Sequence, residues 1–90
     1  MFDTGRIVKT KGINESMKED KKFKYEIISF FTRYMSQDWG DLCDEDKEEN
    51  DKSLLNGNRI LACYQSKKGK VYIITEADRS STTIMFASEY

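Results

Sequence analysis

Two runs of β-branched and aromatic residues near the C-terminal end form the densest hydrophobic pattern of the chain. A polar segment of five residues, Glu76 to Ser80, separates them. Such side chains fit a half-buried pleated surface and lose rotamer freedom in a helix. The pattern therefore predicts a hairpin with strands Lys70–Thr75 and Ser81–Phe86. Both faces of the first strand are largely apolar, so we expect it to be a central strand.

Two further strands precede this hairpin along the chain. Residues Arg59–Gln65 alternate in the same way, and Ser66–Gly69 has the composition of a tight turn into the next strand. Ile7 and Val8 predict a short strand near the N-terminus. The pattern does not indicate which edge of the sheet this first strand joins.

Residues 23–36 have apolar positions at spacings of three and four, which is typical of an amphipathic helix. We expect this helix to cover the sheet. Its stripe consists of Phe23, Ile27, Phe30, Phe31, Tyr34 and Met35. Before it, residues 14–19 predict either a short helix capped by Asn14 or Ser16, or a solvated turn.

Asp44–Asn56 predicts another helix. Its early acids suit the positive end of the helix dipole, and Gly57 lies where a helix-terminating glycine belongs. We expect Asp41 or Asp44 to cap its start. Together these elements predict a single domain over residues 1–90 with an α+β fold in two layers: an antiparallel sheet of three to four strands with two or three helices on one face.

Composition removes several classes of function. The 90 residues carry a net charge of −1 and contain no histidine, which excludes catalysis by Ser-His-Asp or Cys-His groups. Cys43 and Cys63 lack the spacing of a zinc site, and we interpret them as free thiols that fill small apolar spaces. We therefore expect no metal, no cofactor and no enzymatic activity. No apolar run approaches 18 residues, so we expect a cytoplasmic protein without membrane contact.

The sharpest electrostatic feature lies between Asp38 and Asp51, where eight acids accompany one lysine. A solvated helix surface is one interpretation, and an acidic face that docks on a basic surface is the other. Trp39, the single tryptophan, is expected either to anchor a corner of the core or to be an exposed contact residue.

The loop Glu76–Ser80 holds two acids, one arginine and hydroxyl groups. It is either a recognition or catalytic loop, or plain turn chemistry in which Asp78 caps the turn and Arg79 pairs with Glu76 or Asp78. As a small enzyme, the protein would use Glu76, Asp78 and Arg79 with Ser81 or Thr82, but no nucleophile has a visible base partner.

A third hypothesis concerns the first third of the chain, where lysines alternate with Phe23 and Tyr25. Basic and aromatic side chains together can follow a nucleic-acid backbone and stack on bases. The near-zero net charge argues against a general nucleic-acid binder. The lysines are Lys9, Lys11, Lys18, Lys21, Lys22 and Lys24.

Several short blocks together resemble a family of uncharacterised bacterial proteins described as plasmid-related, which occur on plasmids and phage-like elements. The blocks are FDTGRIV at residues 2–8, DWGDL at 38–42, Glu45-Asp46, Asn50, Gly57 with RIL at 59–61, and ITEADRS with Thr82 and Thr83 at 74–83. The resemblance implies a mobile-element setting. It implies no catalytic residue.

The sequence thus favours a small non-catalytic binding protein of a mobile element, in the manner of an anti-restriction or anti-CRISPR inhibitor that acts through an acidic helix. Its partner would be another protein with a basic surface, and its oligomeric state stays open. The predicted partner-binding residues are Asp38, Trp39, Asp41, Asp44, Glu45, Asp46, Glu48, Glu49, Glu76, Asp78 and Arg79.

Overall fold

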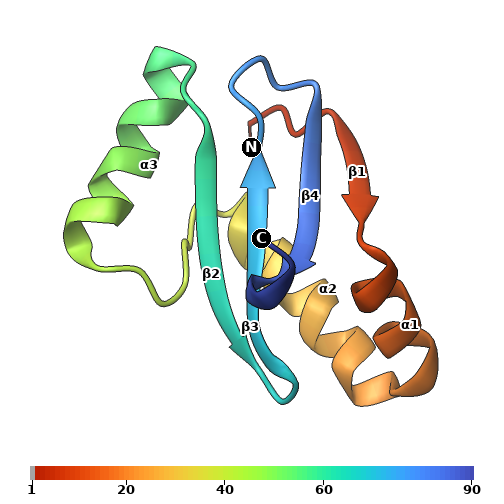
Figure 1. Ribbon diagram of the computed structural model, residues 1–90. Helices are drawn as coiled ribbons and strands as arrows, with labels where there is room; N and C mark the ends of the chain where they lie inside the picture. The colour runs from red at the N-terminus through yellow and green to blue at the C-terminus, as the bar shows by residue number, and fades with distance from the viewer. Residues whose placement is uncertain (1) are drawn as a thin grey trace.

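The computed structural model describes residues 2–90 (Figure 1). In chain order the elements are β1 (Arg6–Lys9), α1 (Lys11–Glu19), α2 (Lys21–Met35), α3 (Asp44–Asn56), β2 (Ile60–Ser66), β3 (Gly69–Thr75), β4 (Ser81–Phe86) and the short 3₁₀ helix η1 (Ala87–Glu89). The predicted α+β fold is confirmed, and α3 has the bounds that its charge pattern and Gly57 predicted.

The sheet has the strand order β1-β4-β3-β2. Strands β2, β3 and β4 form the predicted antiparallel meander, and β3 is a central strand. The expectation of a wholly antiparallel sheet is wrong, because β1 pairs with β4 in parallel, with Ile7 opposite Thr82. All three long helices and two strands separate β1 from β4 along the chain, so no tight turn forces the two strands to run in opposite directions.

Helices α1 and α2 lie on one face of the sheet, whereas α3 stands beside β2 at the sheet edge (Figure 1). The charged segment before α2 is therefore a helix rather than a solvated turn, and Thr10, not Asn14 or Ser16, caps it. On α2 the predicted stripe is the buried one: Phe23, Ile27, Phe30 and Tyr34 are buried. Packing of this stripe on the sheet forms the core of the domain.

A chain of hydroxyl groups crosses this core. Tyr34 Oη lies 2.6 Å from Thr75 Oγ1, which lies 2.7 Å from Thr82 Oγ1, and Thr82 donates to the carbonyl of Thr4 at 2.7 Å. Burial raises the pKa of Tyr34 to about 12. Because each hydroxyl has a partner, these buried polar groups are compatible with an apolar core.

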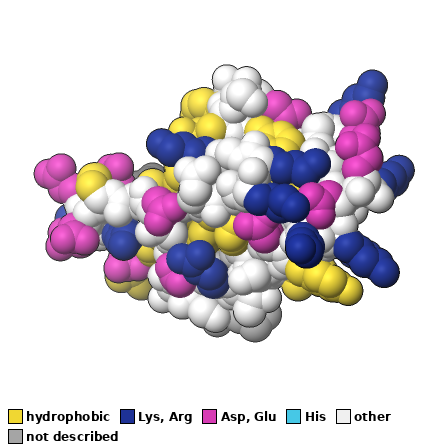
Figure 2. Space-filling view, turned by 90° about the horizontal axis from the view of Figure 1, so that it is seen from below, with side chains coloured by type: hydrophobic (Ala, Val, Ile, Leu, Met, Phe, Trp, Pro, Cys, Tyr) yellow, Lys and Arg dark blue, Asp and Glu magenta, His cyan; other side chains and the backbone are white. Residues whose placement is uncertain are grey.

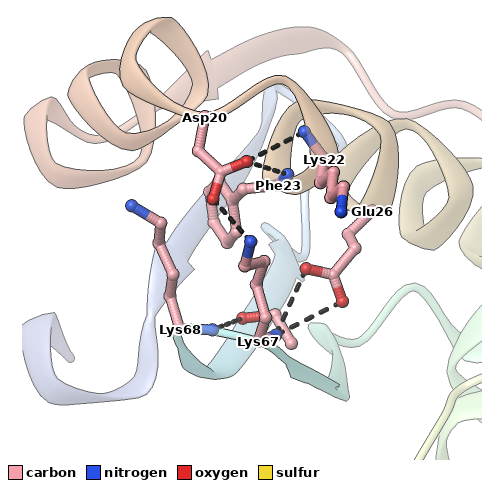
Figure 3. Close-up of polar contacts among 7 residues, drawn as sticks. Asp20, Lys22, Phe23, Glu26, Lys67 and Lys68 are labelled. Carbon is pink, nitrogen blue, oxygen red and sulfur yellow. Dashed lines mark hydrogen bonds and ion pairs between the residues drawn. The ribbon is translucent and has the colours of Figure 1, made fainter.

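The turn between β2 and β3 is tied to the start of α2 through Lys67 (Figure 3). Its ammonium group lies 2.8 Å from Asp20, the residue that also caps α2. The backbone N–H of Lys67 donates to both carboxylate oxygens of Glu26, at 3.2 and 3.3 Å. Two acids of the lysine-rich first third thus bind the β2–β3 turn.

Candidate protein-binding face

Helix α3 is held to the sheet by polar anchors rather than by an apolar stripe. Asn50 bonds both backbone groups of Leu61: its Nδ2 donates to the carbonyl at 2.8 Å and its Oδ1 accepts from the N–H at 3.3 Å. Asn50 therefore takes the place that another strand would occupy at the outer edge of β2. One helix turn further, Ser53 is also buried against the domain.

The segment before α3 covers the same edge of β2. The N–H of Cys63 donates to the carbonyl of Trp39 at 3.2 Å, and the N–H of Asp41 donates to the carbonyl of Cys63 at 2.7 Å. Gly40 lies between them with a φ of +78°, and a Cβ atom there would come within 2.0 Å of the Cys63 oxygen. The close approach of the two backbones therefore requires glycine at this position.

Trp39 belongs to the core, with 2% of its surface exposed. Its ring packs against Phe2 and Tyr34, with centroids 5.9 and 5.5 Å away, and its indole N–H donates to Asp51 at 2.9 Å. The prediction of a core anchor is confirmed, and the alternative of an exposed contact residue is wrong. These aromatic neighbours come from the N-terminal segment and from the end of α2, so the burial of Trp39 depends on the tertiary fold.

The predicted acidic set divides according to its partners. Asp38 forms a 2.8 Å ion pair with Arg33 and accepts from the N–H of Gly40. The Arg33 hydrogen bond is the main reason that the pKa of Asp38 lies below its ordinary value. Asp38 therefore stabilises the end of α2. Asp51 accepts a hydrogen bond from the indole N–H of Trp39. Glu49 lies 3.9 Å from Lys52 in a mostly exposed ion pair that contributes little to stability.

The remaining acids keep their charge available for a partner. They are exposed, and none has an ion-pair partner among residues 2–90. We call this group the acidic face, and it consists of Asp41, Asp44, Glu45, Asp46 and Glu48. The side chains of these acids do not cap α3, as was expected of Asp41 or Asp44, because the cap position falls on Cys43, which makes no side-chain bond. Instead, the acids of the first turn favour the helix through its dipole.

A cleft of about 300 Å³ lies between α3 and β2 beneath the acidic face. Its lining combines the apolar side chains of Leu42 and Leu61 with the carboxylates of Asp46 and Glu49, and Asn50 and Arg59 complete the wall. Apolar side chains beside carboxylates suit a lysine or arginine side chain, whose stem is apolar and whose head is charged, and the two carboxylates of the lining outnumber its one cation, Arg59.

The loop Glu76–Ser80 lies at the other end of α3. Asp78 accepts from the N–H of Ser80 at 3.0 Å, which confirms its predicted role in the turn. The expected pairing of the Arg79 side chain with the Glu76 or Asp78 carboxylate is wrong. Arg79 instead donates to the carbonyls of Ser53, Asn58, Glu76 and Ala77, with the shortest distance, 2.7 Å, to Ser53. A cation at these carbonyls is favoured by the negative end of the α3 dipole.

Glu76 and Asp78 therefore do not join the acidic face. About 13 Å of helix separates Asp44 from Ser53, the residue that Arg79 contacts. Both loop carboxylates are exposed to solvent, and the donors of Arg79 are used by backbone carbonyls. Nothing in this arrangement supports the small-enzyme hypothesis.

Sequence reasoning did not predict that Asn50 anchors α3 to β2, and it did not predict that Arg79 binds backbone carbonyls. Asn50 is the one uncharged polar residue within the acidic run from Asp44 to Asp51, and it lies one helix turn before the leucine pair 54–55. That break in the charge pattern is a weak signal of a buried position. No comparable signal distinguishes an arginine that binds carbonyls from one that binds carboxylates.

Charge is unevenly distributed over the molecule. Figure 2 shows several acidic side chains at the α3 end, whereas Lys and Arg side chains are numerous among the acidic ones toward the end formed by α1 and α2. None of the helices among residues 2–90 has the length and apolar character needed to span a bilayer. Within the same residues, no three Cys, Asp or Glu side chains are grouped so that they could hold a metal ion.

Comparisons with known proteins give no further assignment. No model of a protein family matches the chain, and no curated protein and no solved structure shows significant similarity to it. The resemblance to plasmid-related proteins therefore stays a prediction.

Proposed function

We propose that this protein is a non-catalytic binding module whose acidic face docks on a basic surface of a partner protein. The observation that carries the proposal is the set of five exposed carboxylates on and beside the first half of α3, none of which has an ion-pair partner among residues 2–90. Like charges at neighbouring helix positions repel one another, and a basic partner relieves this repulsion.

The anchoring of α3 supports a rigid presentation of these charges. Asn50 and Trp39, the latter through Asp51, fix the middle of the helix, and Arg79 fixes its last turn. A preorganised charged surface loses less conformational entropy on association than a flexible one. The same carboxylates on a disordered tail would bind less tightly for an equal charge.

The cleft between α3 and β2 gives the interface a specific contact point. A partner's lysine or arginine would place its stem against Leu42 and Leu61 and its head against Asp46 and Glu49. Residues that insert in this way and lose water are the ones that contribute most of the binding energy. The acidic face around the cleft would steer the approach of the partner.

The chemistry of the partner narrows the proposal further. A surface that attracts a rigid row of carboxylates also attracts the phosphates of a nucleic acid, so the acidic face would compete with DNA or RNA for a basic groove. With the predicted mobile-element setting, this favours an inhibitor of a host defence protein, of the anti-restriction or anti-CRISPR kind.

Affinity purification from lysate of the cells that encode the protein tests this function. The bait is the wild type or a variant with three changes in the acidic face, Asp44→Asn, Glu45→Gln and Glu48→Gln. The matched control removes the same charge elsewhere through Glu15→Gln, Glu19→Gln and Glu76→Gln, which are all exposed positions. We expect the wild type and the control to retain the same basic protein, released by salt or DNA, and the acidic-face variant to lose it. Equal retention by all three baits, or retention of no basic protein, would refute the proposal.

A further inference from the structure

The two edges of the sheet differ in whether their outward backbone groups are covered. The outer edge of β2 is covered by Asn50 and by the segment from Trp39 to Asp41. On β1, the N–H groups of Arg6 and Thr10 donate to Ser80 and Ile84, toward β4. Because successive residues of a strand point their backbone groups in opposite directions, the N–H and C=O groups of Ile7 and Lys9 point away from the sheet. β1 therefore offers an open strand edge.

An apolar groove follows this open edge. It has a volume of about 210 Å³ and lies between β1 and α2. Ile7 and Ile28 on its walls are 42% and 50% exposed, which is high for large aliphatic side chains of a folded domain. Met17 and Phe31 extend the apolar lining. We call this the edge groove.

A lysine-lined cleft continues the edge groove. Lys9 and Met17 line both, and the second cleft, of about 340 Å³, is completed by Asn14, Lys18, Lys21 and Lys24. None of its four lysines has an ion-pair partner among residues 2–90. The nearby acids Asp20 and Glu26 are occupied by Lys67, as Figure 3 shows. Four lysines from three elements thus line this cleft, and none of them is held in an ion pair among residues 2–90.

We propose that the β1 edge receives an extended acidic segment of a partner protein as an added strand. The backbone of that segment would bond to the N–H and C=O groups of Ile7 and Lys9. On its side toward α2, an apolar residue would enter the edge groove, and an acidic residue two positions away, about 7 Å along the strand, would meet the lysines. This surface is separate from the acidic face, so the two proposals fail independently.

The charges of β1 exclude a second copy of this chain as the best occupant. In an antiparallel β1–β1 pairing centred on Val8, Ile7 of each copy would lie opposite Lys9 of the other. The two Lys9 side chains would then be diagonal neighbours on one face, and the two lysine-lined clefts would come together without acids between the paired strands. A nucleic acid would satisfy the lysines, but its phosphates cannot donate hydrogen bonds to strand carbonyls, and they leave the apolar groove empty. An acidic peptide strand satisfies all three features at once.

Binding of labelled peptides to the full chain tests the proposal by fluorescence anisotropy. The probe is a ten-residue peptide that repeats the sequence Val-Thr-Glu-Thr. One control peptide replaces Glu by Lys, and a second carries a methyl group on every backbone nitrogen, which removes all backbone donors. We expect saturable, salt-sensitive binding of the acidic probe, at least tenfold weaker binding of either control, and slowed hydrogen exchange at the amides of Ile7 and Lys9.

Variants locate the site. Lys9→Glu with Lys24→Glu should weaken probe binding at least tenfold, whereas Lys11→Glu with Lys22→Glu should leave it unchanged. Ile28→Ser should also weaken binding, while Leu55→Ser, at a position 89% exposed on α3, should not. Absence of saturable probe binding, equal binding of the N-methylated peptide, preference for a DNA or RNA oligonucleotide at the same lysines, or self-association that protects the Ile7 and Lys9 amides would each overturn the proposal.

Discussion

Asn50 of α3 hydrogen bonds to both backbone groups of Leu61 in β2, as a neighbouring strand would. This one side chain joins an acidic helix of low apolar content to the edge of the sheet. It also satisfies two polar groups that would otherwise lack partners in a partly buried place. The direction in which the acidic face points therefore depends on Asn50.

Replacing Asn50 with Ala should lower the free energy of unfolding by about 1–3 kcal/mol, because the N–H and C=O of Leu61 lose their partners. Asn56→Ala, at the exposed last residue of the same helix, should change it by no more than about 0.5 kcal/mol. Urea denaturation of the two variants and the wild type measures the difference. Equal stability of the two variants would show that Asn50 does not hold α3.

Gly40 and Gly57 form a matched pair for testing the covered edge of β2. Both have a positive φ, +78° and +73°, but a Cβ atom at Gly57 meets no atom within 4 Å, whereas at Gly40 it would collide with the Cys63 carbonyl. Gly57→Ala should cost about 1 kcal/mol from backbone strain alone. Gly40→Ala should cost about 3 kcal/mol or more, or prevent folding. Thermal unfolding compares them, and similar melting temperatures would contradict the close backbone approach.

Arg79 should stabilise the protein through carbonyls rather than through an ion pair. Arg79→Ala should lower the free energy of unfolding by about 2 kcal/mol, since hydrogen bonds from a charged donor to Ser53 and Asn58 are lost. Glu76→Gln should have an effect within about 0.5 kcal/mol. If denaturation shows Glu76→Gln to be as costly as Arg79→Ala, the loop is held by a salt bridge instead.

Local patterns predicted most elements of this fold, and long-range contacts account for the differences. The run of acids together with Gly57 predicted α3, and the alternation of apolar and polar residues together with β-branched runs predicted β2, β3 and β4. The parallel pairing of β1 with β4 was not predictable, because it depends on how α1 and α2 pack rather than on the residues of β1. The acids between Asp38 and Asp51 could not be told apart in the sequence, because their contacts are also long-range or depend on local packing. In the structure Asp38 pairs with Arg33, and Asp51 accepts a hydrogen bond from Trp39.

Acid should weaken the fold through Asp38 and Asp20. The pKa of Asp38 is lowered mainly by the hydrogen bond from Arg33, and that of Asp20 mainly by the hydrogen bond from Lys67. A carboxylate whose pKa is lower in the folded than in the unfolded state contributes stability above the unfolded pKa, about 3.9, and loses it as the pH falls through the folded pKa. The free energy of unfolding should therefore decline below about pH 4.

Denaturation at a series of pH values checks this dependence. The variant Asp38→Asn should flatten part of the decline, and the double variant with Asp20→Asn should flatten more of it. Arg33→Gln should remove the contribution that Asp38 makes to the decline in stability through its pairing with Arg33, and it should leave the contribution of Asp20 unchanged. An unchanged acid curve in the double variant would mean that other groups control acid stability.

Binding of the acidic face to a basic protein surface is tested most directly by the affinity of that protein for variants of the face. Once the partner is purified, calorimetric titration should show at least a tenfold loss of affinity, about 1.4 kcal/mol, for the variant Asp44→Asn, Glu45→Gln, Glu48→Gln, with a weaker dependence on salt. The variant Glu15→Gln, Glu19→Gln, Glu76→Gln should bind as the wild type does. Equal affinity of both variants, at every salt concentration, would show that the acidic face does not bind this partner.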